Sequence, residues 1–378
     1  MSKRIYLSPP HMNGSEIGYI QQAFDENWIA PAGPNLTGFE AEMCEYNGIR
    51  CSVALSSGTA AMHLALRYIG ITRGDVVFCS DLTLSGSCNP VIYEGAKLVF
   101  IDSQESSWNM SPVALEKALK AAKKRGTLPK AVIIVDLYGQ SANYDKILPL
   151  CREYGVPVIE DAAEALGAEF NGRKCGTFGE ISIFSFNGNK IITTSGGGMA
   201  VSDDAQAIEK IHFWANQAKE PANYYLHKEL GFNYRMSNIC AGIGRGQLRT
   251  LDERIARRKE INAFYIESFK SLPVTAAPVF EGSKPNYWLT VFTIDEGCEK
   301  TPDEIISALA ADNIEARRAW NPMHSQPYYS DCEYFKENED FSVSEHIFQR
   351  GICMPSGSQM TAEDLERVAK VFSSAFGK

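Results

Sequence analysis

Lys190 is the residue of this chain whose type and setting most clearly suggest a chemical role. It lies in the segment SFNGNKIITTSGGGM (185–199), between an apolar run and three consecutive glycines. Taken alone, a lysine is most often a solvated surface residue, and that interpretation stays open for Lys190. A lysine beside the crevice of a parallel sheet can instead act as an amine nucleophile. Ser185, at the end of the same apolar run, would lie near it.

Asp161 ends a second apolar run, VIEDAAEALGAEF (158–170). Acidic residues at the carboxyl end of a parallel strand point into the crevice where such sheets bind ligands. A carboxylate that is partly buried there needs a cation or hydrogen-bond donors. Asp161 is therefore either the N-cap of the following helix or a counter-ion for a ligand cation.

A third segment, ALSSGTAAMHLAL (54–66), joins the end of an apolar strand to a helix. Gly58 relaxes the backbone, and Thr59 opens the helix with free N–H groups and the positive end of the helix dipole, a combination that favours an anion. A plain helix N-cap is the alternative. The segment lacks the lysine of a Walker-type loop, and AGIGRG (241–246) neither follows a strand nor completes a dinucleotide-binding fingerprint.

The order of these three features points to one cofactor. Pyridoxal phosphate requires an anion site for its phosphate, a carboxylate for its pyridinium nitrogen and a lysine for its Schiff base. The start of the helix at Thr59, the carboxylate of Asp161 and the amine of Lys190 would supply them in that order. Each feature alone is a weak signal, whereas the ordered set predicts a pyridoxal-phosphate site.

The elements that must position these residues follow from the hydrophobic pattern. Short Val-, Ile- and Phe-rich runs alternate with helical patterns between about residues 53 and 205. This alternation predicts an α/β domain with a mostly parallel sheet and crossover helices, covered on both faces. The predicted strands are 75–80, 97–102, 131–139, 156–161, 181–186 and 197–202, and the predicted helices include 59–69, 112–124 and 143–154.

The pattern changes after residue 245. Residues 245–272 read as one long amphipathic helix with a charged face, and 287–295 as a strand. Thr301 and Thr361 each stand at the N-cap of a further helix. The chain is therefore divided into a large cofactor-binding domain, 1–245, and a small α+β domain, 246–378.

Composition sets limits on partners and location. The chain has 378 residues and a formal net charge of −9, which argues against a broad nucleic-acid interface. No run of 18 apolar residues predicts a membrane span, and no apolar core follows the basic start that a signal peptide would need. The 10 cysteines are scattered, without CxxC pairs or metal-finger spacing. We expect a cytoplasmic protein with reduced thiols and no metal site.

The same segments resemble a known enzyme family nearly from end to end. The motifs SSGTAAMHLAL, DLYGQ, VIEDAAEALGA, GTFGEISIFSFNGNK, GFNYRMSN and NPMHSQPYY occur in the order found in the DegT/StrS family of sugar-nucleotide aminotransferases. Within it, LSPPHM, WIAPAGP, EDAAEAL and NGNKIITTSGGGM look most like 4-aminotransferases of UDP-4-keto-6-deoxy-N-acetylhexosamines, as in bacillosamine biosynthesis. The resemblance implies an aspartate aminotransferase-like fold (fold type I) and a homodimer with active sites at the interface.

The resemblance also assigns cofactor-binding residues by position. Lys190 matches the Schiff-base lysine, and Asp161 matches the partner of the pyridinium nitrogen. Two positions depart from the family. Glu164 replaces the usual glutamine near the cofactor's 3-hydroxyl, so it should be protonated or turned elsewhere, and Leu84 replaces the aromatic ring that usually stacks on the pyridine. The other matches are Gly58, Thr59, Ala60 and Ser185 around the phosphate, with Asn233 and Arg235 reaching toward the partner subunit's phosphate.

For the sugar nucleotide, the resemblance points to an N-terminal segment, 1–35, and to the segment RRAWNPMH. Arg317 or Arg318 would bind the diphosphate, because guanidinium groups suit phosphate oxygens, and the other would be a surface residue. His324 is equally well a hydrogen-bonded structural histidine. The substrate-binding residues predicted in this way are Pro10, His11, Ile29, Ala30, Pro31, Arg318 and His324.

The activity implied is transfer of an amino group from L-glutamate to C4 of a UDP-linked 4-keto-6-deoxy sugar. The products would be 2-oxoglutarate and a UDP-4-amino sugar for glycan synthesis, with pyridoxamine phosphate as the intermediate cofactor form. An aminotransferase acting at C3 of a 3-keto sugar is an alternative. Related sugar dehydratases carry histidine at the Lys190 position, a desulfurase would need a catalytic cysteine that nothing here singles out, and a non-catalytic regulatory relative would not need the intact site.

Overall fold

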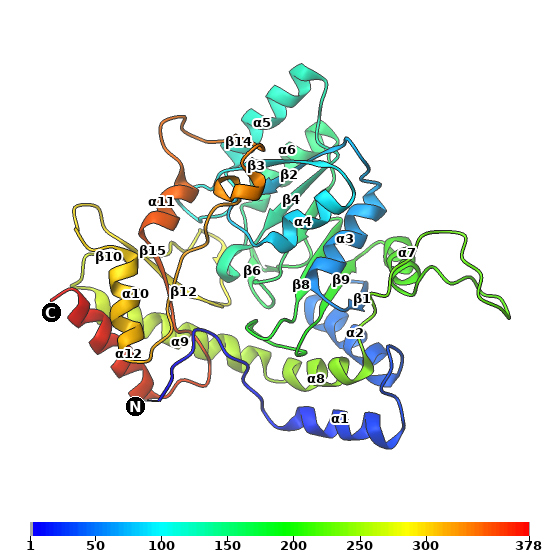
Figure 1. The fold of residues 1–378 in the computed structure, drawn as a ribbon, viewed down its shortest axis with the longest axis horizontal. Coiled ribbons are helices and arrows are strands. Elements are labelled where there is room, and N and C mark those ends of the chain that lie inside the picture. Colours follow the sequence, from blue (N-terminus) through cyan, green and yellow to red (C-terminus); the bar gives the residue numbers. More distant parts are fainter. Residues whose placement is uncertain (1–2, 378) are drawn as a thin grey trace.

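The computed structural model describes residues 3–377. Its largest sheet has eight strands in the order β1-β9-β8-β5-β4-β2-β3-β14 (Figure 1). The strands run parallel except for β9, which is antiparallel to both of its neighbours. Their bounds are β1 Cys51–Leu55, β2 Val76–Ser80, β3 Lys97–Ile101, β4 Ala131–Val135, β5 Val158–Asp161, β8 Ile181–Ser185, β9 Gly198–Ser202 and β14 Glu333–Phe335.

Helices cover both faces of this sheet, as the apolar strands predict. Along β4, Ala131 and Ile133 pack into one buried cluster whereas Val132 and Ile134 pack into another, because successive side chains of a strand point to opposite faces. The first cluster lies under α3, α4 and α7, and the second lies under α5 and α6. These helices span α3 Gly58–Ile69, α4 Ser85–Tyr93, α5 Pro112–Arg125, α6 Tyr144–Tyr154 and α7 Ala205–Ala215.

A smaller part of the molecule is built on a second, antiparallel sheet, β10-β12-β15-β13. Its strands are β10 Val274–Ala276, β12 Thr290–Ile294, β13 Arg317–Arg318 and β15 Gly351–Met354, and its helices are α9 Leu251–Phe269, α10 Pro302–Ala311, α11 Val343–Arg350 and α12 Ala362–Ala375. A third sheet joins β6 Glu169–Phe170, β7 Arg173–Lys174 and β11 Ser283–Lys284. Because β11 and β14 pair with strands of the first 245 residues, the chain crosses the predicted domain boundary more than once, and that division stays a prediction.

The helix predicted over 245–272 is interrupted. The structure has α8 Asn238–Leu248 and then α9, with Thr250 leaving the helical region at φ −114° and ψ 12°. The predicted start lies inside α8, which packs on α1 Ser15–Asp25 and α2 Pro34–Asn47. The glycines of AGIGRG permit this contact, since a Cβ on Gly246 would lie 2.9 Å from the backbone of Glu16.

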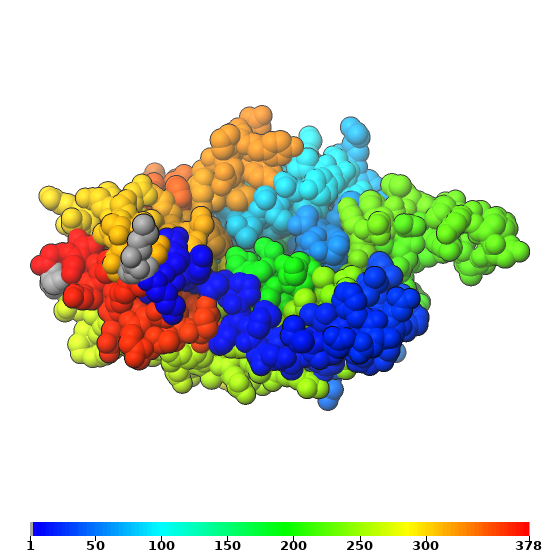
Figure 2. Space-filling view, turned by 60° about the horizontal axis from the view of Figure 1, so that its bottom comes forward, coloured from blue at the N-terminus to red at the C-terminus, as the bar shows by residue number. Residues whose placement is uncertain are grey.

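The N-terminal segment joins the two parts of the molecule. Ile5 bridges to Ile314 in the smaller part, and the following residues cross to α1, which lies on the larger part. Figure 2 shows this segment in blue, running beside the C-terminal residues in red and past the green residues that follow β8. Residues 1 and 2 of the predicted substrate-lining segment 1–35 lie outside the described residues. Of residues 3–35, Tyr6 to Pro10 line a cavity, whereas α1 packs on α8.

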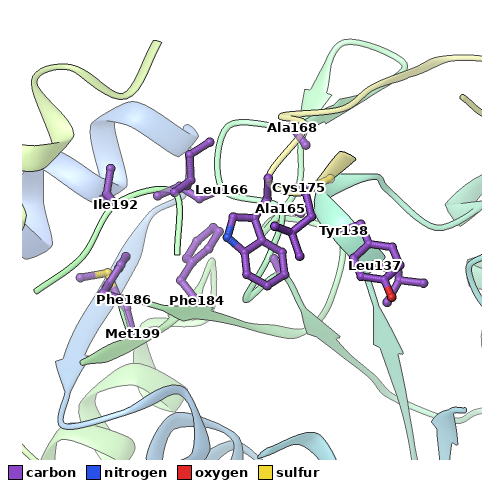
Figure 3. Packing of buried hydrophobic residues seen from close by; sticks show 14 of the residues in the cluster. Leu137, Tyr138, Ala165, Leu166, Ala168, Cys175, Phe184, Phe186, Ile192 and Met199 are labelled. Carbon is purple, nitrogen blue, oxygen red and sulfur yellow. The ribbon is translucent and has the colours of Figure 1, made fainter. Parts of the chain in front are cut away.

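The strand predicted over 131–139 ends at Val135 and gives way to a short 3-10 turn, Leu137–Gly139. Within it Tyr138 has a φ of 54°, a region that favours glycine. Figure 3 shows Tyr138 at one side of a buried cluster that also contains Phe184 and Phe186, from the end of β8. No helix within residues 3–377 is long and apolar enough to cross a membrane.

Candidate active site

A cavity of about 510 Å³ lies where the parallel strands of the large sheet end. Because β1, β2, β5 and β8 run parallel, their carboxyl ends meet at one edge, where α/β sheets bind ligands. The lining includes residues from each of the three predicted segments, namely Ser57, Gly58, Thr59, Asp161, Glu164, Ser185 and Lys190, together with Leu84 and Ser87. The volume is within the range of small-molecule sites.

One end of this cavity is the start of α3. Ser57 caps the helix, and its side chain accepts a hydrogen bond from the Ala60 N–H at 3.0 Å. The Ala60 N–H is thus engaged by the cap in this structure, and the predicted part of Ala60 in phosphate binding stays a prediction. The N–H groups of Gly58 and Thr59 have no partner among residues 3–377, and together with the helix dipole they form an anion site. Ser185 lies beside Gly58, with its Cβ 3.2 Å from where a Cβ of residue 58 would stand.

Asp161 also lines this cavity and lies at the end of β5. Its Oδ2 accepts a hydrogen bond from Ser87 Oγ at 2.6 Å, and its Oδ1 accepts one from the Ala163 N–H at 3.1 Å. Burial raises the pKa of Asp161 above its ordinary value, and these two donors together with the charge of Lys190 act against that rise. The carboxylate is thus held in place by neutral donors and still faces the cavity, as a counter-ion for a ligand cation requires.

Lys190 and Glu164 face each other inside the cavity. Lys190 Nζ lies 3.7 Å from Glu164 Oε1, and both side chains are buried. Glu164 Oε2 accepts a hydrogen bond from the Tyr138 N–H at 2.7 Å. Burial raises the pKa of Glu164, and the charge of Lys190 and the Tyr138 N–H lower it. The effect of burial is the larger, so the pKa lies above its ordinary value. The turn at Tyr138 therefore fixes the carboxyl group that departs from the family pattern.

A second cavity, of about 560 Å³, is lined by Gly188 and Asn189, just before Lys190 in the chain. Trp288 contributes to its wall, and the ring of Trp288 lies 4.2 Å from Lys190 Nζ. Asn189 lines both cavities. The remaining lining comes from the N-terminal segment and the smaller part of the molecule: Tyr6, Leu7, Ser8, Pro9, Pro10, Leu289, Glu315, Arg317 and Trp320. Lys190 thus lines the first cavity and has Asn189 and Trp288 between it and the second.

Three predicted cofactor residues, Ala60, Asn233 and Arg235, do not line the first cavity. Asn233 is exposed, and Arg235 is buried against its own chain, with Nη1 2.7 Å from Glu40 Oε1 and 2.9 Å from the Ala54 carbonyl oxygen. In this chain the guanidinium of Arg235 pairs with Glu40, and the expectation that Arg235 extends toward a partner stays a prediction. Leu84 does line the cavity, and its side chain is 45% exposed, so it leaves the mouth open where the family has an aromatic ring.

Of the predicted substrate residues, some line a cavity and others do not. Pro10 lines the second cavity. His11 is instead held by Ser358, 3.0 Å from its Nδ1, and by Arg254. Burial and the neighbouring arginines lower the pKa of His11. The stretch Ile29, Ala30 and Pro31 is exposed and lines neither cavity.

The segment RRAWNPMH also separates into different environments. Arg318 forms a two-bonded pair with Asp303, with both N···O distances 2.7 Å, whereas Arg317 lines the second cavity. Arg318 lines neither cavity and its guanidinium pairs with Asp303, and its role as the diphosphate ligand stays a prediction. His324 is structural here: its Nδ1 lies 2.7 Å from Asp81 Oδ2 and its ring stacks on Tyr334 at 3.8 Å.

At two of the three glycines after Lys190, the lack of a side chain lets other residues of this chain approach closely. A Cβ on Gly197 would collide with Thr194 and Met236, and one on Gly198 would collide with the backbone of Ser57. A Cβ on Gly196 would meet nothing within 4 Å. Gly196 lines the cavity, and the space beside its Cα is open on the protein side.

Sequence reasoning missed several residues of the site. Ser87 follows a predicted strand at the carboxyl edge, a position that could have drawn attention to its hydroxyl. Trp288, Trp320 and Asn189 gave no such signal, because their roles arise only when the smaller part of the molecule packs beside Lys190.

The first cavity fits the predicted cofactor. Free N–H groups at a helix start suit a phosphate, Asp161 suits a protonated ring nitrogen, and Lys190 supplies a buried amine between them. The polar groups needed by pyridoxal phosphate are therefore present. The N–H groups of Gly58 and Thr59 have no hydrogen-bond partner among residues 3–377, Asp161 binds neutral donors, and Lys190 Nζ lies 3.7 Å from Glu164.

Comparison with known proteins gives a consistent result. Residues 10–373 match the sequence profile of the DegT/DnrJ/EryC1/StrS aminotransferase family. EpsN of Bacillus subtilis (strain 168), provisionally assigned as a pyridoxal phosphate-dependent aminotransferase, is 52% identical over 377 residues, covering 100% of this chain and 97% of EpsN. The structure of a DegT DnrJ EryC1 StrS aminotransferase from Brucella abortus is 27% identical, covers 96% of both chains and superposes with a TM-score of 0.88.

Relatives with a stated sugar product differ in nucleotide. The GDP-perosamine synthase of Caulobacter vibrioides is 35% identical, over 97% of this chain and 96% of its own. A UDP-4-amino-4,6-dideoxy-N-acetyl-beta-L-altrosamine transaminase of Campylobacter jejuni is 29% identical, over 99% of this chain and 98% of its own. Both matches extend over almost the whole chain, so the relationship is not confined to the motifs.

Proposed function

The chain belongs to the DegT/DnrJ/EryC1/StrS aminotransferase family, and from this premise we propose that it transfers an amino group from L-glutamate to C4 of a nucleotide-linked 4-keto-6-deoxy sugar. Its fold is that of the pyridoxal-phosphate aminotransferases of fold type I, and pyridoxal phosphate is its cofactor. The sugar we favour is a UDP-linked 2-acetamido-2,6-dideoxy-4-hexulose, and the product a UDP-4-amino sugar for surface glycans.

The observation that carries this proposal is that Lys190 shares one cavity with the helix start at Gly58 and the carboxylate of Asp161. The second cavity, which includes Arg317 and Pro10, shares Asn189 with the first. The amine of Lys190 is therefore placed to reach a cofactor in the first cavity, and the neighbouring cavity offers space for part of the substrate.

The residues of the site have distinct tasks in this proposal. Pyridoxal phosphate, when bound, supplies a carbonyl group and a conjugated ring that accepts the electrons of a broken C–H bond. Gly58, Thr59 and Ser185 would hold its phosphate, and Asp161 would keep its ring nitrogen protonated. Lys190 Nζ would take the proton from Cα of glutamate and later deliver one to C4 of the sugar. The face from which it delivers that proton fixes whether the new amine is axial or equatorial.

The second cavity supports a sugar nucleotide as the amino acceptor. Arg317 stands in its wall, paired with Glu315 at 2.9 Å. Since the side chain of Arg317 is 65% exposed, it can exchange that partner for a phosphate oxygen at little cost. Trp288 and Trp320 offer flat apolar surfaces in the same wall. We therefore assign the diphosphate to Arg317 in place of Arg318.

We further propose that the active unit is a homodimer. Residues 217–232 project from the body of the molecule (Figure 1). Tyr224, Tyr225 and Leu230 on this projection are 63%, 79% and 66% exposed. Large exposed apolar side chains gathered on one segment favour an interface, and the family resemblance favours a second copy of the chain as the partner.

A GDP-linked 4-keto sugar is a second candidate substrate, favoured by the 35% identity with a GDP-perosamine synthase. A 3-keto sugar with amination at C3 remains the alternative in reaction position. The experiment that separates them supplies glutamate with a panel of UDP-, GDP- and dTDP-linked 4-keto and 3-keto sugars. Product formation is followed by mass spectrometry, and the position of the amine by NMR. Amination of 3-keto sugars alone would exclude the C4 assignment.

The role of Lys190 is tested separately. We expect Lys190→Ala to abolish turnover and to lose the visible absorbance of covalently bound cofactor, while the protein still folds. Borohydride reduction of the wild-type protein followed by peptide mapping should place the cofactor on Lys190. Turnover at the wild-type rate in the alanine variant would show that another residue moves the proton.

A further inference from the structure

Arg258 is a buried cation for which no carboxylate partner is found among residues 3–377. It lies on α9 with its side chain 2% exposed, and the charged group acting on it is another cation, Arg254. Burial lowers the pKa of Arg258 to about 9. Its Nε has no partner among residues 3–377. Burying an unpaired guanidinium is costly, so the hydrogen bonds it does make call for an explanation.

Those hydrogen bonds join two distant parts of the chain. Arg258 Nη2 donates to Ser8 Oγ at 3.0 Å, and Nη1 donates to the carbonyl oxygen of Trp288. Ser8 belongs to the N-terminal segment, and Trp288 precedes β12 of the smaller sheet. Both side chains are buried. One guanidinium therefore fixes a hydroxyl and a backbone carbonyl from elements 280 positions apart in sequence.

The two fixed residues converge on a single atom next to the reactive lysine. Ser8 Oγ donates to the carbonyl oxygen of Asn189 at 2.8 Å, and the indole Nε1 of Trp288 donates to the same oxygen at 2.7 Å. A carbonyl oxygen has two lone pairs, so it is saturated by these donors. Because the peptide bond is planar, holding this oxygen also fixes the orientation of the Lys190 N–H and the departure of its Cα.

Trp288 also touches the far end of the lysine side chain. Its ring lies 4.2 Å from Lys190 Nζ, a cation–π contact. Lysine has a long flexible stem, which loses much rotamer freedom when it is held in place. The same residue thus limits Lys190 at both its backbone and its amine.

We propose that Arg258, Ser8 and Trp288 form a clamp that positions Lys190 for attachment of the cofactor. The clamp is anchored in the smaller part of the molecule and in the N-terminal segment, whereas Lys190 belongs to the loop after β8. The packing of the smaller part of the molecule and of the N-terminal segment is thereby coupled to the reactivity of Lys190. This inference rests on the proposed role of Lys190, although the geometry of the clamp does not.

The first experiment measures the loop directly. Hydrogen exchange of the full-length protein, with and without pyridoxal phosphate, reports on the Lys190 N–H, which donates to the Asn187 carbonyl at 3.0 Å. Ser8→Ala and Trp288→Phe each remove one donor, and we expect exchange in residues 187–194 to rise about fivefold. Ser8→Thr keeps the hydroxyl and should restore protection. Arg258→Met should have the larger effect, because both donors lose their support.

The matched control is Tyr265→Phe. Tyr265 lies on the same helix, and its hydroxyl donates to the Pro355 carbonyl at 2.9 Å. This variant loses one buried hydrogen bond to a backbone carbonyl, as Trp288→Phe does, but that bond does not involve Asn189. We expect comparable loss of melting temperature and unchanged exchange in residues 187–194.

The second experiment measures the rate at which cofactor-free protein takes up pyridoxal phosphate, followed by visible absorbance, with borohydride reduction and peptide mapping to confirm the site. Ser8→Ala and Trp288→Phe should slow attachment about fivefold or more, and Tyr265→Phe should not. The clamp is disproved if attachment and exchange both match the wild type, or if exchange rises while attachment stays unchanged. Attachment at a lysine other than Lys190 would instead overturn the proposed function and leave the exchange result standing.

Discussion

Glu160 and Asp161 are consecutive on β5, yet their carboxyl groups lie on opposite faces of the sheet and in opposite kinds of environment. Asp161 faces the cavity, receives two hydrogen bonds and lies near Lys190. Glu160 is fully buried and accepts four hydrogen bonds, at distances of 2.5 to 3.2 Å. The donors are the N–H groups of Gly176, Phe178 and Gly179 and the hydroxyl of Ser182.

The face of Glu160 carries a second carboxyl group. Asp136, Glu160 and Cys175 each place a polar atom within 4.8 Å of the others, and all three are buried. Burial and the charge of Glu160 raise the pKa of Asp136 well above its ordinary value. Asp136 Oδ2 has no donor facing it among residues 3–377. A proton on Asp136, donated to Glu160, accounts for both facts without a cation.

The difference between the two faces separates a structural carboxylate from a functional one. Both are buried at the end of one strand, so residue type and burial do not distinguish them. The number of protein donors does: Glu160 is saturated by its own chain and closes the loop 176–182, whereas Asp161 keeps room for a ligand. We expect substitutions on the Glu160 face to affect folding, and substitutions on the Asp161 face to affect chemistry.

The largest expected effect is on chemistry. Asp161→Asn keeps the size of the side chain and an acceptor for Ser87, but removes the charge that a protonated ring nitrogen needs. Turnover should fall about a hundredfold or more, and the cofactor should dissociate more readily, as Asp161→Ala would also show. Steady-state kinetics and equilibrium dialysis measure these effects. Melting of the cofactor-free protein should change little, and unaltered turnover and retention would remove Asp161 from the site.

The next effect is on folding. Glu160→Gln replaces one acceptor oxygen by an N–H₂ group that faces the N–H donors of the loop. Leaving buried donors unsatisfied costs about 3 kcal/mol or more for such a network. Denaturant unfolding monitored by fluorescence gives the free energy of unfolding. If the variant lost activity while its stability equalled that of the wild type, the two faces would not differ in the way described.

A third effect depends on pH. The folded pKa of Asp136 is raised, so the folded state holds a proton that the unfolded chain releases above its ordinary pKa of about 3.9. The contribution of Asp136 to stability is therefore complete below that pH and is lost as pH rises through the folded pKa. Asp136→Asn supplies a permanent N–H to Glu160 and does not titrate.

Unfolding of wild type and Asp136→Asn across pH 4 to 8 tests this directly. The two proteins should be close in stability at the acid end. With rising pH the wild type should weaken relative to the variant, by at most about 1.4 kcal/mol per pH unit. Asp161 and Glu164 also have raised pKa values, but they titrate in both proteins and cancel in the difference. A constant difference across the range would mean that Asp136 is ionised in the folded protein.

The sequence predicted the large sheet and its carboxyl edge because both depend on local pattern. Apolar runs identify strands covered on both faces, and the residues that end them, such as Asp161, must gather at one edge once the strands are parallel. That reasoning places Thr59, Asp161 and Lys190 at a common edge, and all three line one cavity there. It could not tell which of two adjacent acidic residues faces the cavity, since a strand begun one residue earlier would exchange them.

Other parts of the site depend on contacts between segments far apart in sequence. Arg235 pairs with Glu40, 195 positions away, and Arg318 pairs with Asp303 in the separate helix α10, and neither partner carries a motif that would have indicated the pairing. The contact of Trp288 with Lys190 depends on how the smaller part of the molecule packs. Hydrophobic periodicity describes one element at a time, so it gives no information on such pairings.

The smallest expected effects come from a matched pair of serines, one on each face. Ser182 Oγ donates to Glu160 Oε2 at 2.7 Å, and Ser87 Oγ donates to Asp161 Oδ2 at 2.6 Å. Replacing either by alanine removes one hydroxyl from a buried carboxyl group, worth about 1.5 kcal/mol for a charged acceptor. Ser182→Ala should lower the free energy of unfolding by about that amount and leave cofactor affinity unchanged.

For Ser87→Ala, we expect a loss of similar size to weaken cofactor binding. The Ser87 hydroxyl lowers the pKa of Asp161, so its loss raises that pKa further and leaves less of the carboxylate ionised on the acid side. Cofactor retention should therefore weaken as pH falls, and should do so at a higher pH than in the wild type, by about one pH unit for 1.4 kcal/mol. Equilibrium dialysis against pH measures the midpoint in both serine variants. Equal midpoints for Ser87→Ala, Ser182→Ala and wild type would mean that Ser87 only fills space, and that the ionisation of Asp161 is set by burial and Lys190.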